Sequence, residues 1–276
     1  MMMTSDMFQG RLAIIGGGKM GEAIAAGLLA SGLVPVEYLA IAEPLASRRD
    51  ELAAAHGVAV FADGREALEG ARMAILAVKP QSIDSVVRDL VDGLSGTVVV
   101  SIAAGVSCAR LETLLPEGTP VVRVMPNTPA MVREGMALVS GGRAASDEQV
   151  EAVATVFGAL GRATVIDERF QDAGTAISGS GPAYFALVVD ALARAGVAQG
   201  LPRDVAQELA VQTMRGTAGL LQQTGIHPEQ LIDGVSSPGG TTIAAVNVLE
   251  AHGVRAAFAS AVAAAAERAK ELGAGR

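Results

Sequence analysis

Short apolar runs alternate with longer amphipathic stretches over roughly the first 166 residues of the chain. Runs rich in Val, Ile, Leu and Ala predict β-strands at residues 12–15, 38–42, 58–61, 73–78, 98–102, 121–125, 137–139 and 164–166. Between two of these runs, apolar residues recur every three or four positions from Ile83 to Leu94, which is the spacing of a helix laid on a sheet. This alternation predicts βαβ units around a mainly parallel sheet.

The strand pattern stops after about residue 167. Alanine-rich amphipathic segments follow at residues 182–199, 203–224, 228–234, 241–251 and 254–272, which predicts an all-helical second half. We therefore predict a Rossmann-type, doubly wound α/β domain at residues 1–167 and an all-α domain at residues 168–276. The small residues on the helical faces fit packing within one chain or between two chains equally well.

A glycine-rich segment, Gly16-Gly17-Gly18-Lys19-Met20-Gly21, joins the first predicted strand to the first helix. It has the form G-x-G-x-x-G in the strand–turn–helix context that binds dinucleotides. In that role Gly16 permits the tight turn, Gly18 lets the backbone approach the pyrophosphate, and Gly21 lets the helix lie against the strand. The free N–H groups of the helix then face the phosphates, so the segment predicts a nicotinamide dinucleotide site.

The ends of later strands predict the rest of this site. Glu43, 22 residues past Gly21, stands where an acidic residue commonly binds the adenosine ribose, which favours NAD(H). Arg48 or Arg49 could instead hold the 2′-phosphate of NADP(H), so the sequence leaves the choice of NADP or NAD open. The strand-end segments 77–80 and 101–105 are expected beside the nicotinamide half of the cofactor.

Two glycine-rich patches, at residues 172–184 and 233–242, interrupt the helical half. The second, with the sequence V-S-S-P-G-G-T-T, places small hydroxyl side chains and free N–H groups at the start of a helix, an arrangement that suits a carboxylate. Ordinary helix capping by Ser237 or Thr242 is the alternative.

Composition narrows the class of protein. Half of the residues are hydrophobic, 18% are charged and the net charge is −8, which excludes the disordered class and argues against nucleic acid as a partner. Cys108 is the only cysteine, and His56, His227 and His252 show no metal-binding spacing. We see no apolar run near the ~18 residues of a membrane span and no export signal in residues 1–10, so we expect a cytoplasmic enzyme that acts on a small molecule.

Taken together, G-G-G-K-M-G, A-V-K-P, M-P-N-T-P-A, S-G-S-G-P-A-Y and V-S-S-P-G-G-T-T make the chain resemble the pyrroline-5-carboxylate reductase family from residue 11 to residue 272. The resemblance implies hydride transfer from NAD(P)H to the C=N carbon of 1-pyrroline-5-carboxylate, which gives L-proline in the last step of proline biosynthesis. It also implies a homodimer or larger homo-oligomer.

The resemblance assigns roles to individual residues. Thr242 is expected to be catalytic, beside the substrate nitrogen, and Glu168 is a secondary expectation for the substrate site. The other residues expected at the substrate are Ser237, Gly239, Gly240 and Thr241, and those expected to line the cofactor are Gly16, Gly18, Lys19, Met20, Gly21, Ala77, Val78, Lys79, Pro80, Ala103 and Ala104. Asp63 departs from the Asn that many members carry, and so puts one cofactor contact in doubt.

Two other functions compete with this interpretation. A 3-hydroxyacid dehydrogenase-like enzyme would need a catalytic lysine in the helical half, and residues 172–249 contain no lysine. A non-catalytic scaffold that senses dinucleotides would be expected to have lost the substrate turn, whereas V-S-S-P-G-G-T-T is intact.

Overall fold

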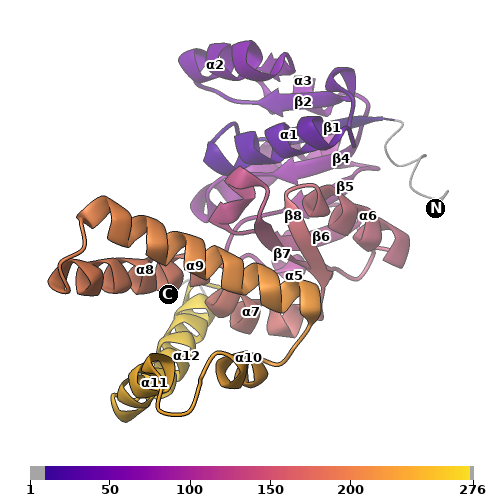
Figure 1. The fold of residues 1–276 in the computed structure, drawn as a ribbon. Coiled ribbons are helices and arrows are strands. Elements are labelled where there is room, and N and C mark those ends of the chain that lie inside the picture. Colours follow the sequence, from indigo (N-terminus) through magenta and orange to yellow (C-terminus); the bar gives the residue numbers. More distant parts are fainter. Residues whose placement is uncertain (1–9, 274–276) are drawn as a thin grey trace. The chain divides into compact units, whose positions relative to one another are not determined.

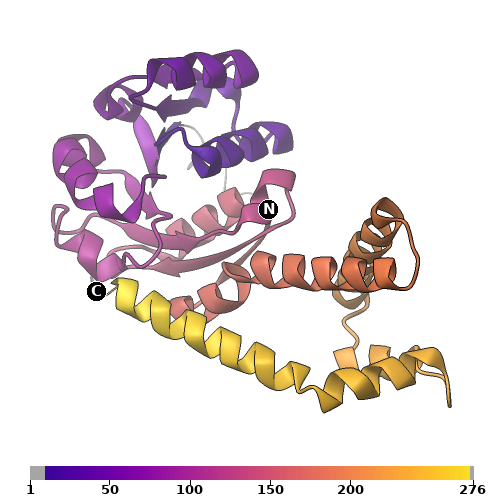
Figure 2. The same cartoon turned by 90° about the vertical axis from the view of Figure 1, so that its left-hand side faces the viewer.

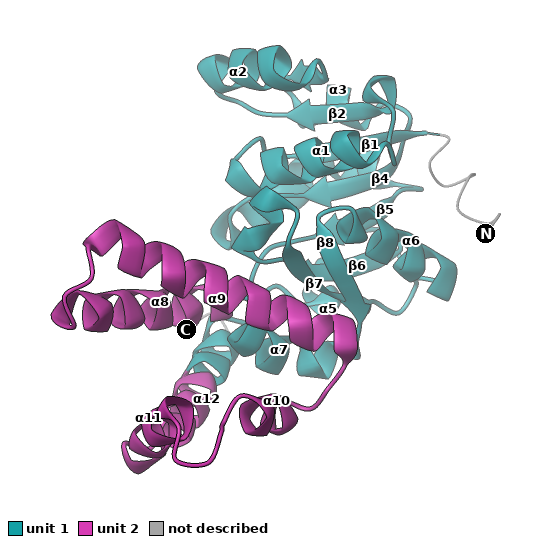
Figure 3. Cartoon of the chain, in the orientation of Figure 1, with its two compact units in different colours: residues 1–180, 265–276 teal, residues 181–264 magenta. Residues whose placement is uncertain are grey.

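The computed structural model describes residues 10–273, so residues 1–9, where no export signal is expected, lie outside it (Figure 1). The chain forms two compact units (Figure 3). The first contains residues 1–180 and 265–276, and the second contains residues 181–264.

The first unit is built on one eight-stranded sheet with the order β3-β2-β1-β4-β5-β6-β7-β8. Its strands are β1 (Arg11–Ile15), β2 (Leu39–Ala42), β3 (Ala59–Phe61), β4 (Ala71–Leu76), β5 (Val98–Ser101), β6 (Val121–Met125), β7 (Gly135–Gly141) and β8 (Gly161–Val165). All neighbouring pairs are parallel except β6 and β7. Only the short turn η3 (Thr128–Val132) joins those two strands, which is too little chain for the crossover that a parallel pair requires.

Helices cover both faces of the central strands of the sheet. Successive side chains of a strand point to opposite faces, so each central strand contributes to both hydrophobic clusters. In β1, Leu12 and Ile14 belong to one hydrophobic cluster, whereas Ala13 and Ile15 belong to the other. Helices α1 (Lys19–Ser31), α2 (Ala46–His56) and α6 (Asp147–Gly158) contribute to the first cluster. Helices α3 (Gly64–Leu68), α4 (Ile83–Leu94) and α5 (Cys108–Glu112) contribute to the second (Figures 1 and 2). The predicted Rossmann-type fold class is confirmed.

The second unit is helical, as predicted. It contains α8 (Gly181–Ala198), α9 (Arg203–Thr224), α10 (Pro228–Gly234), α11 (Thr241–Ala251) and the first part of α12 (Val254–Gly273), whose last turns belong to the first unit. Helices α8 and α9 approach closely where Gly196 faces Ala206, because a Cβ at Gly196 would lie only 3.1 Å from the Ala206 methyl group.

Helix α7 (Gln171–Ser178) belongs to the first compact unit, although the predicted boundary at residue 168 assigns it to the second domain. It packs on β7, since a Cβ at Gly174 would lie 2.3 Å from a methyl group of Leu138 and the Gln171 amide donates to the Leu138 carbonyl. The two compact units therefore meet in sequence between residues 180 and 181. That cofactor binding and substrate binding divide at residues 167 and 168 stays a prediction.

Judged by length and composition alone, the helical stretch Glu168–Ala198 is long and apolar enough to cross a membrane. The sequence led us to expect no such run, because polar residues and glycines interrupt it and only an average over 18 residues reveals it. In the structure the stretch comprises η4 (Glu168–Phe170), α7 and α8, with a turn at residues 179–180. Only 17% of the qualifying window is buried, so α8 presents apolar side chains at the surface.

Candidate active site

The glycine turn between β1 and α1 has the shape that a dinucleotide needs. Gly16 has φ +113°, and a Cβ on it would lie 2.6 Å from the Ala77 carbonyl oxygen. A Cβ on Gly21 would lie 2.0 Å from the Gly16 carbonyl oxygen, so neither glycine can carry a side chain without a shift. By contrast, within residues 10–273 no atom other than those of Gly18 and its chain neighbours lies within 4 Å of a Cβ built on Gly18, the N-cap of α1. The first N–H groups of α1 therefore border open space that can take a phosphate.

The other predicted cofactor residues lie along the same edge of the sheet. Residues 77–80 directly follow β4, and the Ala77 N–H donates to the Ile15 carbonyl at 2.8 Å. Ala103 and Ala104 follow β5, and the Ile102 N–H bonds the Leu76 carbonyl. Since β2, β1, β4 and β5 are neighbours and parallel, their carboxyl ends form the edge at which doubly wound folds bind ligands.

Glu43, the first residue after β2, contacts the glycine turn directly. Its Oε2 accepts from the Gly17 N–H at 3.0 Å, and its Oε1 accepts from the Leu45 N–H at 3.0 Å. Gly17 makes this contact possible, because a Cβ there would lie 3.1 Å from the Glu43 Cβ and 2.5 Å from Leu52. The predicted ribose-binding carboxylate is thus held beside the turn.

Apart from Glu168, the predicted substrate residues lie in the second unit, just before and at the start of α11. Gly240 is the N-cap of this helix, Gly239 has φ +67°, and the Gly240 N–H closes a turn onto the Ser237 carbonyl at 2.9 Å. The first backbone bond of the helix runs from the Ala244 N–H to the Gly240 carbonyl. The backbone N–H groups of Thr241 and Thr242 precede that bond, and no side chain caps them, so they can donate hydrogen bonds to an anion. Thr242 is half-buried.

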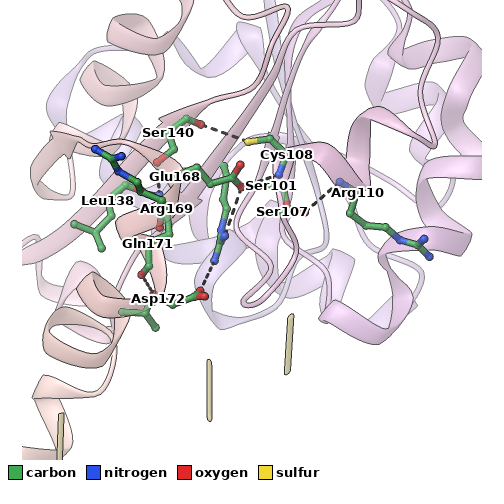
Figure 4. Close-up of polar contacts among 12 residues, drawn as sticks. Ser101, Ser107, Cys108, Arg110, Leu138, Ser140, Glu168, Arg169, Gln171 and Asp172 are labelled. Carbon is green, nitrogen blue, oxygen red and sulfur yellow. Dashed lines mark hydrogen bonds and ion pairs between the residues drawn. The ribbon is translucent and has the colours of Figure 1, made fainter. Parts of the chain in front are cut away.

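Glu168 lies in the first unit, where other protein groups bind its carboxylate (Figure 4). Its Oε1 accepts from the Cys108 N–H at 2.8 Å and lies 3.4 Å from Nη1 of Arg123. The Nη2 of Arg123 lies 3.2 Å from Oδ1 of Asp172 on α7. We call Arg123, Glu168 and Asp172 the arginine clamp. The clamp joins β6, the start of α5 and the start of α7.

Arg123 is not among the residues predicted from the sequence. The signal was present, because Arg123 is the only charged residue in the otherwise apolar strand V-V-R-V-M and is 7% exposed. A buried guanidinium requires carboxylate partners. The neighbouring Cys108 is buried as expected. Burial and the nearby Glu168 carboxylate raise the pKa of its thiol to about 12, so it is neutral and unreactive near pH 7.

Comparison with known proteins places both units in one family. A family model described as pyrroline-5-carboxylate reductase dimerisation matches residues 168–272, and one described as NADP oxidoreductase, coenzyme F420-dependent, matches residues 11–105. The pyrroline-5-carboxylate reductase of Synechocystis is 45% identical over 95% of this chain and 98% of its own length. The chain belongs to the pyrroline-5-carboxylate reductase family. The Arabidopsis thaliana member is 43% identical over 95% of each chain.

Solved structures of pyrroline-5-carboxylate reductases agree with this assignment. The Coxiella burnetii structure superposes with a TM-score of 0.91 at 35% identity, covering 95% of this chain and 98% of its own. The Plasmodium falciparum structure, which has NADP bound, gives 0.84 at 30% identity over 96% and 98%. The predicted family, the enzyme class of NAD(P)H-dependent oxidoreductase and the NAD(P) cofactor class are confirmed. The roles of individual site residues stay predictions.

The glycine turn predicts different outcomes for two alanine variants. Gly18→Ala should fold normally but fill the space above α1, and should weaken dinucleotide binding about tenfold or more, or ~1.4 kcal/mol. Gly21→Ala should also lower the free energy of unfolding, by about 1–3 kcal/mol, because its methyl group meets the Gly16 carbonyl. Calorimetric titration with NADH and NADPH and chemical denaturation measure the two effects. Unchanged binding in Gly18→Ala would contradict the proposed phosphate position.

The arginine clamp predicts non-additive stability. Glu168→Gln or Asp172→Asn alone should lower the free energy of unfolding by about 1 kcal/mol, because the other carboxylate still pairs with Arg123. The double variant leaves a buried guanidinium without a counter-charge and should cost about 3 kcal/mol or more. Arg169→Gln, which breaks a pair whose side chains are both mostly exposed, is the control and should cost less than about 0.5 kcal/mol. Denaturation curves measure all four, and simple additivity would refute a shared role.

Proposed function

We propose that this protein reduces 1-pyrroline-5-carboxylate to L-proline with NADH or NADPH as the hydride donor. The observation that carries the proposal is the end-to-end match to pyrroline-5-carboxylate reductases, because it includes both the glycine turn and the V-S-S-P-G-G-T-T bend. Residues 168–272 match the dimerisation model, which supports assigning substrate binding and oligomerisation to the predicted second domain, residues 168–276.

The strand ends of the first unit would hold the cofactor. Gly18, Lys19 and Met20 are at the start of α1, where backbone N–H groups and the helix dipole favour the pyrophosphate. The ribose of adenosine would contact Glu43. The loops after β4 and β5 would line the nicotinamide half through residues 77–80, Ala103 and Ala104. When bound, the reduced nicotinamide supplies the hydride.

The bend before α11 would hold the substrate carboxylate. Ser237, Thr241 and Thr242 offer hydroxyl groups, and the backbone of Gly239 and Gly240 is free of side-chain bulk. Glu168 is the exception among the predicted substrate residues, because its bonds to the Cys108 N–H and Arg123 support a structural role.

The proposed reaction depends more on positioning the imine and the hydride donor than on activating the imine. The cyclic imine is basic enough to enter protonated, so its carbon is already electrophilic. Addition of hydride to that carbon moves the C=N π electrons onto nitrogen, which keeps its proton and becomes the neutral amine of proline. The protein's tasks are then to align the two reactants and to orient the nitrogen, for which the Thr242 hydroxyl is our candidate.

The comparisons support a proposal for the assembly of the protein, and its cysteine content supports one for its location. The dimerisation model and the exposed apolar side chains of α8 support a homo-oligomer, either a dimer or a larger assembly. We infer that small molecules and further copies of the chain are its partners. The net charge of −8 argues against nucleic acid, and a second copy of the chain, in place of a membrane, would cover the apolar face of α8. A cytoplasmic location agrees with a single buried thiol.

The deciding assay follows oxidation of NADH and NADPH with 1-pyrroline-5-carboxylate as the only acceptor. Turnover with formation of proline is expected, and no turnover with either cofactor would refute the proposal. A 3-hydroxyacid dehydrogenase would instead turn over hydroxyacids, and a sensing scaffold would bind dinucleotide without turnover.

Thr242→Ala should lower kcat/KM for the imine about a hundredfold while leaving dinucleotide affinity unchanged, because the hydroxyl that orients the nitrogen is lost. Thr242→Ser keeps that hydroxyl and should retain most of the activity. Steady-state kinetics together with calorimetric titration of NADH separate the two parameters. Full activity in Thr242→Ala would remove this residue from the mechanism.

Leu187→Asp should dissociate the oligomer. The Leu187 side chain lies on α8 with 69% of the residue exposed in the isolated chain, and a charge there would be buried against a second copy. Val36→Asp, at a partly exposed apolar position in the first unit, is the matched control and should leave the mass unchanged. Light scattering coupled to gel filtration reads the mass, and an intact oligomer in Leu187→Asp would exclude this face as the interface.

A further inference from the structure

The arginines beside the adenosine end of the predicted cofactor site are already engaged by protein groups. Arg48 donates through Nε to the Gly17 carbonyl at 3.0 Å, through Nη1 to Glu51 at 2.8 Å, and through Nη2 to Glu22. These carboxylates, Glu51 first and then Glu22, raise the pKa of Arg48. Arg49 donates to the carbonyls of Glu43 and Pro44. A 2′-phosphate would have to displace carboxylates to gain either guanidinium.

The carboxylate of Glu43 is fixed at the same place. Both of its oxygens accept backbone N–H bonds, one from the glycine turn and one from Leu45, so the charge cannot swing away from the turn. A second carboxylate, Asp63, follows β3, the strand next to β2, and it accepts from the Arg65 N–H at the start of α3. The Asp63 carboxylate also lies 3.5 Å from Nη1 of Arg65, whereas the Glu43 carboxylate forms no ion pair within residues 10–273.

We infer that Glu43 makes this enzyme prefer NADH to NADPH. The inference rests on the proposed function for the position of the cofactor. A carboxylate at the end of the second strand accepts hydrogen bonds from ribose hydroxyls, whereas the 2′-phosphate of NADPH would bring one to two negative charges against it. Like charges that meet at a binding site cost several-fold to many-fold in affinity. Arg48 therefore braces the turn and does not serve as a phosphate ligand.

The test uses ADP-ribose and 2′-phospho-ADP-ribose as probes, because they differ only in the 2′-phosphate and contain no nicotinamide. Calorimetric titration of the wild-type protein should show ADP-ribose binding about tenfold tighter or more. Equal affinity, or tighter binding of the phosphorylated probe, overturns the inference.

Two variants assign the effect to one residue. Glu43→Gln should reduce the ratio of the affinities for ADP-ribose and 2′-phospho-ADP-ribose severalfold. Glu51→Gln removes the same charge from the other side of Arg48 and should leave that ratio unchanged. An equal shift in both variants would mean that general electrostatics decides the preference, and would overturn the role of Glu43. If Glu43→Gln does not fold, the wild-type ratio and the next variant still decide the question.

The double variant Arg48→Gln with Glu51→Gln removes a charge pair together and keeps the net charge. It should leave the ratio of the two probes unchanged, and a selective loss of 2′-phospho-ADP-ribose binding would make Arg48 the phosphate ligand and overturn the inference. Turnover with 1-pyrroline-5-carboxylate is measured separately. Failure of turnover with both cofactors refutes the proposed function, whereas the binding ratio decides the cofactor preference by itself.

Discussion

The close approach of backbone to backbone at the glycine turn constrains the rest of the first unit. A Cβ at Gly21 would lie 2.0 Å from the Gly16 carbonyl oxygen, and one at Gly16 would lie 2.6 Å from that of Ala77. Without side chains at these two positions, the chain can leave β1, turn within a few residues and start α1 directly above the ends of β1 and β4. The free N–H groups of the helix then lie at the edge where six neighbouring parallel strands, from β3 to β6 in the sheet order, end together.

The charged residues of this unit follow from the same geometry. A sheet that is buried on both faces leaves its carboxyl edge as the place where polar groups can gather, and Glu43 reaches the turn there because Gly17 makes room for it. Further along the sheet, the buried Arg123 of β6 forms ion pairs with Glu168 of η4 and Asp172 of α7. The Glu43 carboxylate is held by backbone N–H groups and the Arg123 guanidinium by two carboxylates, so each contact can be tested by a single substitution.

The repeating parts of this fold could be predicted from the sequence, whereas contacts between distant residues could not. The runs at 12–15 and 121–125 match β1 and β6, and every helix of the second unit was predicted within a few residues, because hydrophobic periodicity reports directly on burial. The antiparallel β6–β7 pair and the packing of α7 on β7 depend on connection lengths and on the Gly174–Leu138 contact, which no local pattern reveals. The bonds of Glu168 to Cys108 and Arg123 are likewise contacts between distant residues, and the expected place of Glu168 at the substrate stays a prediction.

The chain connects its two compact units at two points. The chain passes from the first unit to the second at residues 180–181 and returns within α12 at residues 264–265. Each connection begins on an element that is anchored to the first unit. Helix α7 is held by Asp172 at its start and at its end by Asn127, whose amide donates to the Ser178 carbonyl at 3.0 Å. The last residue of α12, Gly273, lies against Gly105, whose Cβ would be 3.2 Å from the Gly273 nitrogen. Because Gly105 belongs to the loop of Ala103 and Ala104, the α12 connection is anchored beside residues that we propose to hold the nicotinamide, whereas the α7 connection is anchored to β6 and to the loop that follows it.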